Sequence, residues 1–192
     1  MQATERALWD GAAMDGVQGT YTAEDYWSLP EGQRAELIKG ELYDMAAPSR
    51  EHQRLVLQIC RRKSDYIEAN GLPCEADDAP FAVNLRADDS VFVEPDVLVV
   101  CDKDKLSDRG CEGAPDLIVE VVSPSSRHMD YATKNALYID AGVREYWIVD
   151  PERQRTTIYR YEEDAAPMIL PFSMPVTSGI CPDFSLVMAE LI

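Results

Sequence analysis

The stretch Leu117-Ile118-Val119-Glu120-Val121-Val122 decides the fold of this chain, because aliphatic side chains run through it without alternating with polar ones. Such a run is typical of a strand that is buried on both faces, which predicts helices on both sides of its sheet. Glu120 is the exception within the run. An unpaired buried carboxylate costs several kcal/mol, so Glu120 must be protonated, paired or bound to a cation. An arginine from a neighbouring helix, or a strand end that reaches water, would also satisfy it.

A second aliphatic run, Val97–Val100, follows the pair Pro95-Asp96 and predicts a neighbouring strand. Two carboxylates on adjacent strands can share a hard cation such as Mg²⁺, which takes oxygen ligands and waters. Such an ion polarises a phosphoryl oxygen and lowers the pKa of bound water. Asp96 and Glu120 are therefore candidate metal ligands. Asp116 shares a face with Glu120 by the period of two and is an alternative to Asp96.

Outward from these runs, the pattern predicts elements in the order helix, strands, helix, strand. Thr22 is the candidate N-cap of a short helix that Pro30 ends, and Lys39-Gly40 is the candidate turn of a hairpin over 35–45. The other predicted elements are a helix from Ser49 to about Ala69, a polar loop over 102–113, a helix from Ser125 to Asp140, and strands over 145–150, 156–161 and 168–172. Residues 1–19 lack periodicity and are interpreted as a flexible lead-in, whereas residues 20–192 suit one mixed α/β domain.

The composition limits the class of protein. Hydrophobic residues make up 46% and charged residues 28% of 192, which is ordinary for a globular chain large enough to bury a core. The five cysteines are an odd number without CxxC spacing, so we expect neither a disulfide framework nor a zinc site, and a reducing compartment. The longest apolar runs fall far short of the ~20 residues that a membrane span needs. With no visible secretory signal, we expect a cytoplasmic protein without a membrane partner.

The net charge of −17 is unusual for a nucleic-acid partner, because Lys and Arg contacts to phosphate dominate the affinity of such proteins. The predicted helix after Ser49 is locally basic, in contrast to the acidic chain as a whole. Its basic residues are Arg50, Arg54, Arg61, Arg62 and Lys63, against the acids Glu51 and Asp65. Arg50, Arg54 and Arg61 share one face, which either follows a phosphate backbone or is an ordinary solvated face.

Five stretches, in a fixed order, resemble one known family. They are 36–42 (Glu-Leu-Ile-Lys-Gly-Glu-Leu), Pro48-Ser49 with His52, 94–97 (Glu-Pro-Asp-Val), 115–125 (Pro-Asp-Leu-Ile-Val-Glu-Val-Val-Ser-Pro-Ser) and 141–151 (Ala-Gly-Val-Arg-Glu-Tyr-Trp-Ile-Val-Asp-Pro). Together they are similar to the Uma-two family of restriction endonuclease-like proteins, within the PD-(D/E)XK nuclease superfamily. The resemblance covers about residues 21–161.

The resemblance implies a restriction-endonuclease-like αβββαβ core, in which a mixed central sheet is flanked by helices and joined by an N-terminal hairpin and short C-terminal strands. It also implies that Asp96 and Glu120 hold Mg²⁺ or Mn²⁺, with the carbonyl of Val121 completing the shell. The superfamily pattern expects a lysine two residues after the glutamate, and here that position is Val122.

Three further candidate catalytic residues come from the same pattern. Lys134, together with Asp130, matches a lysine that relatives supply from the next helix, where it would orient the attacking water or offset charge on the phosphorane. His52 also matches, although a histidine at the edge of an apolar stripe is more often a satisfied core residue than a ligand. Glu41 is either a third acid of the site or a strand charge that faces water.

The function that the resemblance implies is a divalent-metal-dependent endonuclease acting on DNA. Because of the acidic surface, we expect binding to DNA to be weak and strongly dependent on salt and metal. A homodimer is expected, since two-fold assemblies are the commonest. The alternative is a nuclease-like fold without catalysis that acts as a dimeric binding or regulatory module, which Val122 and the acidic surface favour. A third interpretation keeps the metal but takes a small phosphoester as substrate.

Overall fold

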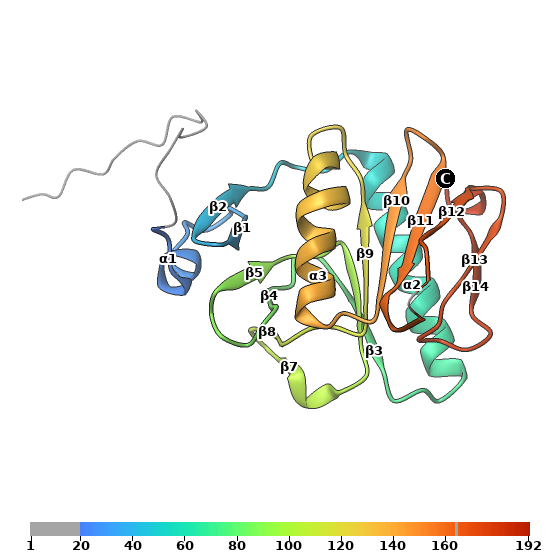
Figure 1. The fold of residues 1–192 in the computed structure, drawn as a ribbon, viewed down its shortest axis with the longest axis horizontal. Helices are drawn as coiled ribbons and strands as arrows, with labels where there is room; N and C mark the ends of the chain where they lie inside the picture. Colours follow the sequence, from blue (N-terminus) through green and yellow to red (C-terminus); the bar gives the residue numbers. More distant parts are fainter. Residues whose placement is uncertain (1–19, 164) are drawn as a thin grey trace, which may run out of the picture.

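A six-stranded mixed sheet forms the centre of the computed structural model, which describes residues 20–163 and 165–192 (Figure 1). Its strands, in spatial order, are β12 (Met168–Pro171), β11 (Arg155–Arg160), β10 (Glu145–Asp150), β9 (Leu117–Val121), β6 (Val97–Val100) and β3 (Glu75–Asp78). Strands β9 and β10 are parallel, and the other neighbours are antiparallel. The lead-in expected at residues 1–19 lies outside the described residues.

Helices cover both faces of this sheet, as the unbroken apolar run of β9 predicted. On one face, Val119 and Val121 pack in a cluster with residues of α2 (Arg50–Ala69). On the other face, Ile118 packs in a cluster with residues of α3 (Asn135–Ala141). Figure 1 shows α3 in front of the sheet and α2 behind it. The predicted α/β class, with a mixed sheet between helices, is therefore confirmed.

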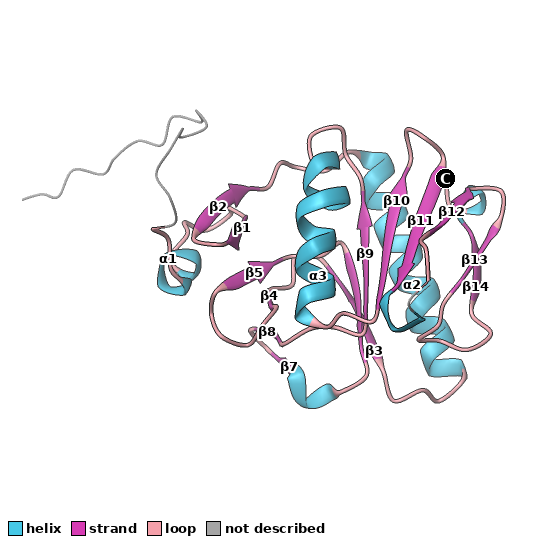
Figure 2. Cartoon of the chain, in the orientation of Figure 1, coloured by secondary structure: helices cyan, strands magenta, loops and turns pink. Residues whose placement is uncertain are grey.

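A second six-stranded sheet lies beside the first and carries the N-terminal hairpin (Figure 2). Its order is β2 (Glu41–Asp44), β1 (Ala35–Ile38), β5 (Val91–Val93), β4 (Val83–Asn84), β8 (Gly110–Glu112) and β7 (Leu106–Ser107). The hairpin turn is confirmed at Lys39 and Gly40, which both have positive φ. The short helix α1 (Ala23–Trp27) packs on this sheet and begins at the expected N-cap, Thr22. The prediction of a polar loop over 102–113 was wrong, because β7, β8 and the 3-10 turn η1 (Lys103–Lys105) lie within it.

The helix that follows β9 is less regular than the sequence predicted. Instead of one α-helix from Ser125, the structure has a π-helical turn, η2 (Met129–Lys134), that leads into α3. A π-turn is rare and frequently marks a functional site. Here both Asp130 and Lys134 are buried on the turn, so it directs two charged side chains towards the sheet. The helix ends at Gly142, which has the left-handed conformation.

The C-terminal segment closes one side of the core. It contains the 3-10 turns η3 (Tyr161–Glu163) and η4 (Met188–Glu190) and the small antiparallel pair β13 (Pro175–Thr177) and β14 (Ser185–Val187). Among the described residues, no helix has the length and apolar character that a membrane span would need.

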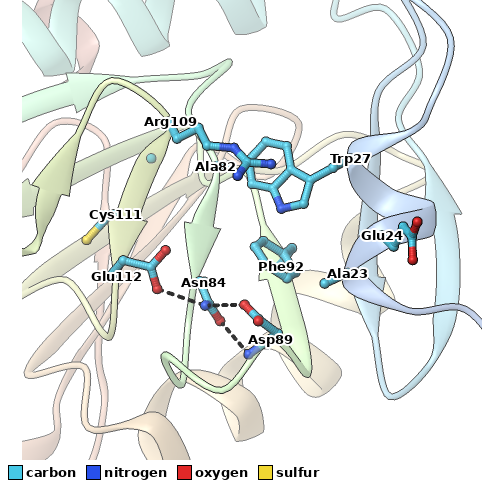
Figure 3. Close-up of a pocket in the computed structure, with 11 residues that line it drawn as sticks. Ala23, Glu24, Trp27, Ala82, Asn84, Asp89, Phe92, Arg109, Cys111 and Glu112 are labelled. Carbon is cyan, nitrogen blue, oxygen red and sulfur yellow. Dashed lines mark hydrogen bonds between the residues drawn. The ribbon is translucent and has the colours of Figure 1, made fainter.

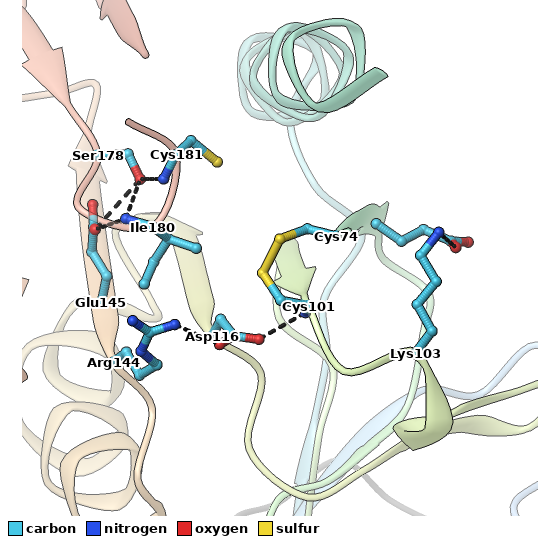
Figure 4. The surroundings of a disulfide bond; sticks show 10 residues. Cys74, Cys101, Lys103, Asp116, Arg144, Glu145, Ser178, Ile180 and Cys181 are labelled. Carbon is cyan, nitrogen blue, oxygen red and sulfur yellow. Dashed lines mark hydrogen bonds and ion pairs between the residues drawn. A yellow bond between two sulfur atoms is a disulfide. The ribbon is translucent and has the colours of Figure 1, made fainter. Parts of the chain in front are cut away.

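The sequence predicted no disulfide framework, but one pair of cysteines is bonded. Cys74 and Cys101 are bonded at the end of the β3–β6 ladder, one position beyond the pair Glu75 and Val100 (Figure 4). Two cysteines that face each other on antiparallel strands can be brought together by the strand register alone, which spacing along the chain does not reveal. Cys60, Cys111 and Cys181 are free thiols.

The basic helix α2 offers fewer free charges than its sequence indicated. Lys63 is completely buried, with Nζ 4.3 Å from the ring centre of Trp147 and 3.9 Å from that of Phe184. The guanidinium of Arg54 donates to the carbonyl of Leu191, and that of Arg61 pairs with Asp65. The predicted basic stripe is thus partly engaged within the molecule.

Candidate active site

Asp96 and Glu120 lie opposite each other where the β6–β9 ladder ends. Val97 pairs with Val119, so the next antiparallel position places Asp96 across from Glu120. Directly opposed residues on neighbouring strands have Cβ atoms about 4.5–5.5 Å apart and side chains on the same face. Asp96 Oδ2 also accepts a hydrogen bond of 2.7 Å from the backbone N–H of Val121, which holds this carboxylate at the strand end.

Lys134 is the centre of a buried ionic cluster. Its Nζ lies 2.9 Å from Glu120 Oε1, 2.9 Å from Glu36 Oε1 and 3.8 Å from Asp130 Oδ1, and all four side chains are at most 5% exposed. Glu36 reaches the cluster from β1, and its Oε1 also accepts the backbone N–H of Glu94. Three buried carboxylates therefore share one ammonium. Such an arrangement is stable only if further hydrogen bonds, protons or a cation complete it.

Two hydroxyl groups complete part of the cluster. The hydroxyl of Tyr138 donates to Glu120 Oε1 over 2.7 Å, and that of Ser126 donates to Asp130 Oδ2 over 2.7 Å. Tyr138 is fully buried on α3, one turn after Lys134. The helix thus supplies both groups that hold Glu120.

Tyr138→Phe is expected to lower the free energy of unfolding by about 1–3 kcal/mol, because it removes a donor from a buried carboxylate. The measurement is urea unfolding at neutral pH. Tyr159→Phe is the control, since its ring is stacked on Tyr146 and no hydrogen bond of its hydroxyl is found among the described residues. Equal stability of Tyr138→Phe and the wild type would contradict the role of this hydroxyl.

The charges of the cluster shift one another's protonation. Burial raises the pKa of Glu120 well above its ordinary value, with Lys134 opposing and Asp96 adding to the effect. Burial likewise raises the pKa of Asp130 to about 6. For Lys134, burial alone would lower the pKa, but Glu120 and Glu36 outweigh it and raise the pKa well above its ordinary value. Lys134 is therefore an ammonium at neutral pH, while its acids are only partly compensated.

His52 lies against the same strand ends from the first turn of α2. Its Nε2 is 3.3 Å from Asp96 Oδ2. Burial opposes the imidazolium, but the neighbouring carboxylate of Asp96 and the backbone of Val121 outweigh it and raise the pKa of His52. The histidine is thus half-buried beside Asp96 and Val121, two of the three residues that the resemblance assigned to the metal shell.

The donor chemistry of the site fits a hard divalent cation. Each of the two opposed carboxylates has one oxygen outside the bonds just described, Oδ1 of Asp96 and Oε2 of Glu120, and carboxylate oxygens are the ligands that Mg²⁺ and Mn²⁺ prefer. The negative charge of the four acids also exceeds the charge of Lys134 and His52. Within residues 20–163 and 165–192, however, no three His, Cys, Asp or Glu side chains already surround a single point as a metal-ligand set.

Two residues considered from the sequence lie elsewhere. Glu41 is exposed on β2 and accepts a hydrogen bond from Tyr43, so the structure does not bring it to the cluster. Asp116 lies four residues before Glu120, where it bonds to Arg144 and to the backbone N–H of Cys101 (Figure 4). Of the two candidates to accompany Glu120, only Asp96 is opposite it on the ladder.

Glu36 is the acid that the sequence reasoning missed. It sits five residues before Glu41 on the partner strand of the same hairpin. The signal that could have found it is the one that identified Glu120, because Glu36 interrupts a short strand, Ala35–Ile38, that is buried throughout. A second buried acid, Glu94, supports this region by accepting bonds from Arg34 and Tyr26.

The chain resembles known proteins along most of its length. The family model described as "Uma2: Putative restriction endonuclease" matches residues 23–189. Uncharacterized protein slr1290 of Synechocystis sp. is 24% identical over 150 residues, which are 77% of either chain, and uncharacterized protein sll1609 is 27% identical over 72% of this chain and 80% of that one. The crystal structure of a "putative nuclease belonging to DUF820" from Anabaena variabilis has a TM-score of 0.73 at 16% identity, over 90% of this chain and 97% of that one. This last likeness shows a shared fold.

Proposed function

The chain belongs to the Uma2 family of restriction-endonuclease-like proteins, and from this premise we propose that it is a divalent-metal-dependent endonuclease that hydrolyses DNA phosphodiester bonds. Restriction-endonuclease-like proteins generally use divalent metal ions. We assign Mg²⁺ or Mn²⁺ to Asp96 and Glu120, with the carbonyl of Val121 as a further ligand. When bound there, the ion would polarise a phosphoryl oxygen and make water more acidic.

The proposal rests mainly on one observation. Lys134 Nζ lies 2.9 Å from Glu120 Oε1. By the period of two, a lysine at position 122 would point to the same face as Glu120, but Val122 is a buried core residue there. Lys134 reaches that face from the following helix. The chain thus has an ammonium beside the glutamate although the superfamily position lacks it.

The charge of each side chain determines the role that we propose for it. Lys134 is protonated at neutral pH and can only donate hydrogen bonds, so it orients the attacking water or offsets charge on the phosphorane, and it does not accept the water's proton. Glu36 and Asp130 position the ammonium from two sides. His52 holds Asp96 Oδ2 and leaves Oδ1 for the cation.

The test is nicking of supercoiled plasmid at low salt with Mg²⁺, with Mn²⁺ and with chelator. We expect metal-dependent nicking by the wild type and its loss in Glu120→Gln, because the amide is a weaker ligand that carries no charge. Glu75→Gln is the matched control: it removes one charge from an exposed glutamate of β3 and should nick like the wild type. Circular dichroism of all three proteins separates loss of chemistry from loss of fold.

Equal nicking by Glu120→Gln and the wild type would contradict the assignment of the site. No nicking with either metal, despite a folded protein, would favour the dimeric binding module instead. We expect the nicking to fall with salt, because a chain of net charge −17 holds DNA only through local contacts of Lys and Arg to phosphate, and salt weakens these contacts. We also propose that residues 20–192 act as one domain and that a homodimer cuts both strands, which light scattering would test.

A further inference from the structure

A second candidate binding site lies between α1 and the second sheet, outside the Lys134 cluster. It is a pocket of about 190 Å³ (Figure 3). Pockets for drug-sized ligands have volumes of about 300–1,000 Å³, so this one suits a single planar ring system. Its lining includes the aromatic rings of Trp27 and Phe92 and the charged side chains of Arg109 and Glu112.

One side of the pocket combines an aromatic ring with a planar cation. The guanidinium of Arg109 lies 4.3 Å from the ring centre of Trp27, which is 41% exposed. Arg109 is at the turn between β7 and β8, and among the described residues no carboxylate lies within 4.0 Å of its guanidinium. Its donors are therefore available to a ligand that stacks against or beside the indole.

Another side of the pocket holds two carboxylates in fixed orientation. The buried amide of Asn84 donates to Asp89 Oδ1 over 2.9 Å and to Glu112 Oε2 over 2.8 Å. Asn84 Oδ1 in turn accepts the backbone N–H of Asp89. Each carboxylate keeps its other oxygen outside these bonds. Figure 3 shows this row of three side chains below the stacked pair Trp27 and Arg109.

We propose that this pocket binds one unpaired guanine base of a DNA strand, an inference that rests on the proposed function. Guanine presents O6 and N7 as two acceptors on one edge, which an arginine contacts in a bidentate manner. Its adjacent edge presents N1–H and the N2 amino group as donors, which a carboxylate accepts. Arg109 can donate to O6 and N7, and Glu112 can accept from N1–H and the N2 amino group. Trp27 provides an aromatic surface on which an unstacked base can stack. Adenine and hypoxanthine lack the N2 amino group.

The pocket and the Lys134 cluster lie on opposite faces of the paired strands β1 and β5. Phe92, at the pocket, pairs with Leu37 on β1, and the neighbouring residue Glu36 contacts Lys134. The two sites therefore share a pair of adjacent strands.

Fluorescence anisotropy of a labelled single-stranded oligo-dT with one central guanine tests this, in chelator so that nothing is cleaved. The same strand with hypoxanthine or adenine at that position is the comparison. We expect guanine to bind about tenfold more tightly than either, since a good bidentate contact discriminates by that order. Free dGMP should compete more weakly than the strand, because it lacks the flanking phosphates. Equal affinity for all three strands, or dGMP competing as well as the guanine strand, would overturn the proposal.

Two exposed residues provide variants that should fold normally. Glu112→Gln and Arg109→Leu are expected to lose the guanine preference, and their matched controls Glu75→Gln and Arg61→Leu are expected to keep it. Glu112→Gln also lowers the net negative charge, which by itself would strengthen binding to every strand. Loss of the preference is thus separated from a general charge effect. A preference retained in Glu112→Gln would contradict the proposal, and because no cleavage is measured, that result would leave the nicking test untouched.

Discussion

Replacing Lys134 with methionine is expected to lower the free energy of unfolding at neutral pH by about 3–5 kcal/mol, the range for breaking a buried ionic network by removing one partner. The reason is that Glu36, Glu120 and Asp130 would stay buried without their shared cation. Urea unfolding measures this loss. Lys103→Met is the control, because its pair with Glu75 is exposed and surface ion pairs contribute only about 0–1 kcal/mol.

The loss should depend on pH in a defined direction. The pKa values of Asp130 and Glu120 are already raised in the folded protein, and removing Lys134 takes away the charge that opposes this rise. Acids with raised pKa values destabilise the fold above those values and cease to do so once protonated. The deficit of Lys134→Met should therefore be largest near pH 8, shrink as the pH falls towards about 6, the pKa of Asp130 in the wild type, and level off below it, because the acids of the variant take up protons at higher pH. A deficit that grows on acidification would refute this account of the cluster.

The same variant tests the proposed chemistry. Loss of one electrostatic stabiliser of a transition state costs a factor of about 10²–10³ in rate. Lys134→Arg, which keeps the charge, should fold better than Lys134→Met and retain more nicking. If Lys134→Met is folded at the assay pH and nicks like the wild type, Lys134 is structural and the metal site acts without it.

Replacing Lys63 with methionine is expected to stabilise the protein at pH 7 by about 1–3 kcal/mol. Burial lowers the pKa of Lys63 from 10.5 to about 8, and a pKa unit corresponds to about 1.4 kcal/mol, so keeping it protonated costs roughly 3 kcal/mol. Its Nζ has no hydrogen-bond partner among the described residues. The rings of Trp147 and Phe184 offset part of the cost through cation–π attraction of up to about 2 kcal/mol. Methionine fills a similar volume without a charge.

The pH dependence of this gain follows from the lowered pKa. The unfolded chain holds the Lys63 proton up to about 10.5, whereas the folded chain releases it near 8, so wild-type stability from this group rises between these values. Lys63→Met lacks this titration. Its advantage in urea unfolding should be complete below pH 8 and decline towards pH 10. If the variant is less stable than the wild type at pH 7, the aromatic contacts outweigh the cost of burial.

Local patterns in the sequence were sufficient to predict most elements. The apolar run around Glu120 predicted a strand covered on both faces, and the turn at Lys39-Gly40 predicted a hairpin, because each signal lies within a few residues. The π-turn over Met129–Lys134 escaped prediction, since no short pattern distinguishes it from an α-helix. The burial of Lys63 was not predicted for another reason. Its neighbours Trp147 and Phe184 lie far from it in the sequence, on a strand and in a loop.

Two buried glutamates show a limit of what the sequence alone can predict. Glu120 and Glu145 both lie in apolar strands and are both buried. In the folded chain, Glu145 accepts bonds from the indole of Trp147 and the backbone N–H groups of Gly179 and Ile180, so it is satisfied by the C-terminal segment. Glu120 instead meets Lys134 beside Asp96. The patterns of the two strands do not separate a structural acid from a candidate ligand.

By itself, the sequence determined the hairpin, the strands β6 and β9 to β12, and the candidates Asp96, Glu120, Lys134 and His52, because periodicity and ordered motifs are local properties of the chain. Tertiary structure alone decided that Glu36, and not Glu41, reaches Lys134, and that Cys74 bonds to Cys101. Both depend on strand register, which joins residues far apart in the chain. The pocket of Trp27, Asn84, Arg109 and Glu112 depends on it as well, since the register of β4, β5 and β8 brings these segments beside α1.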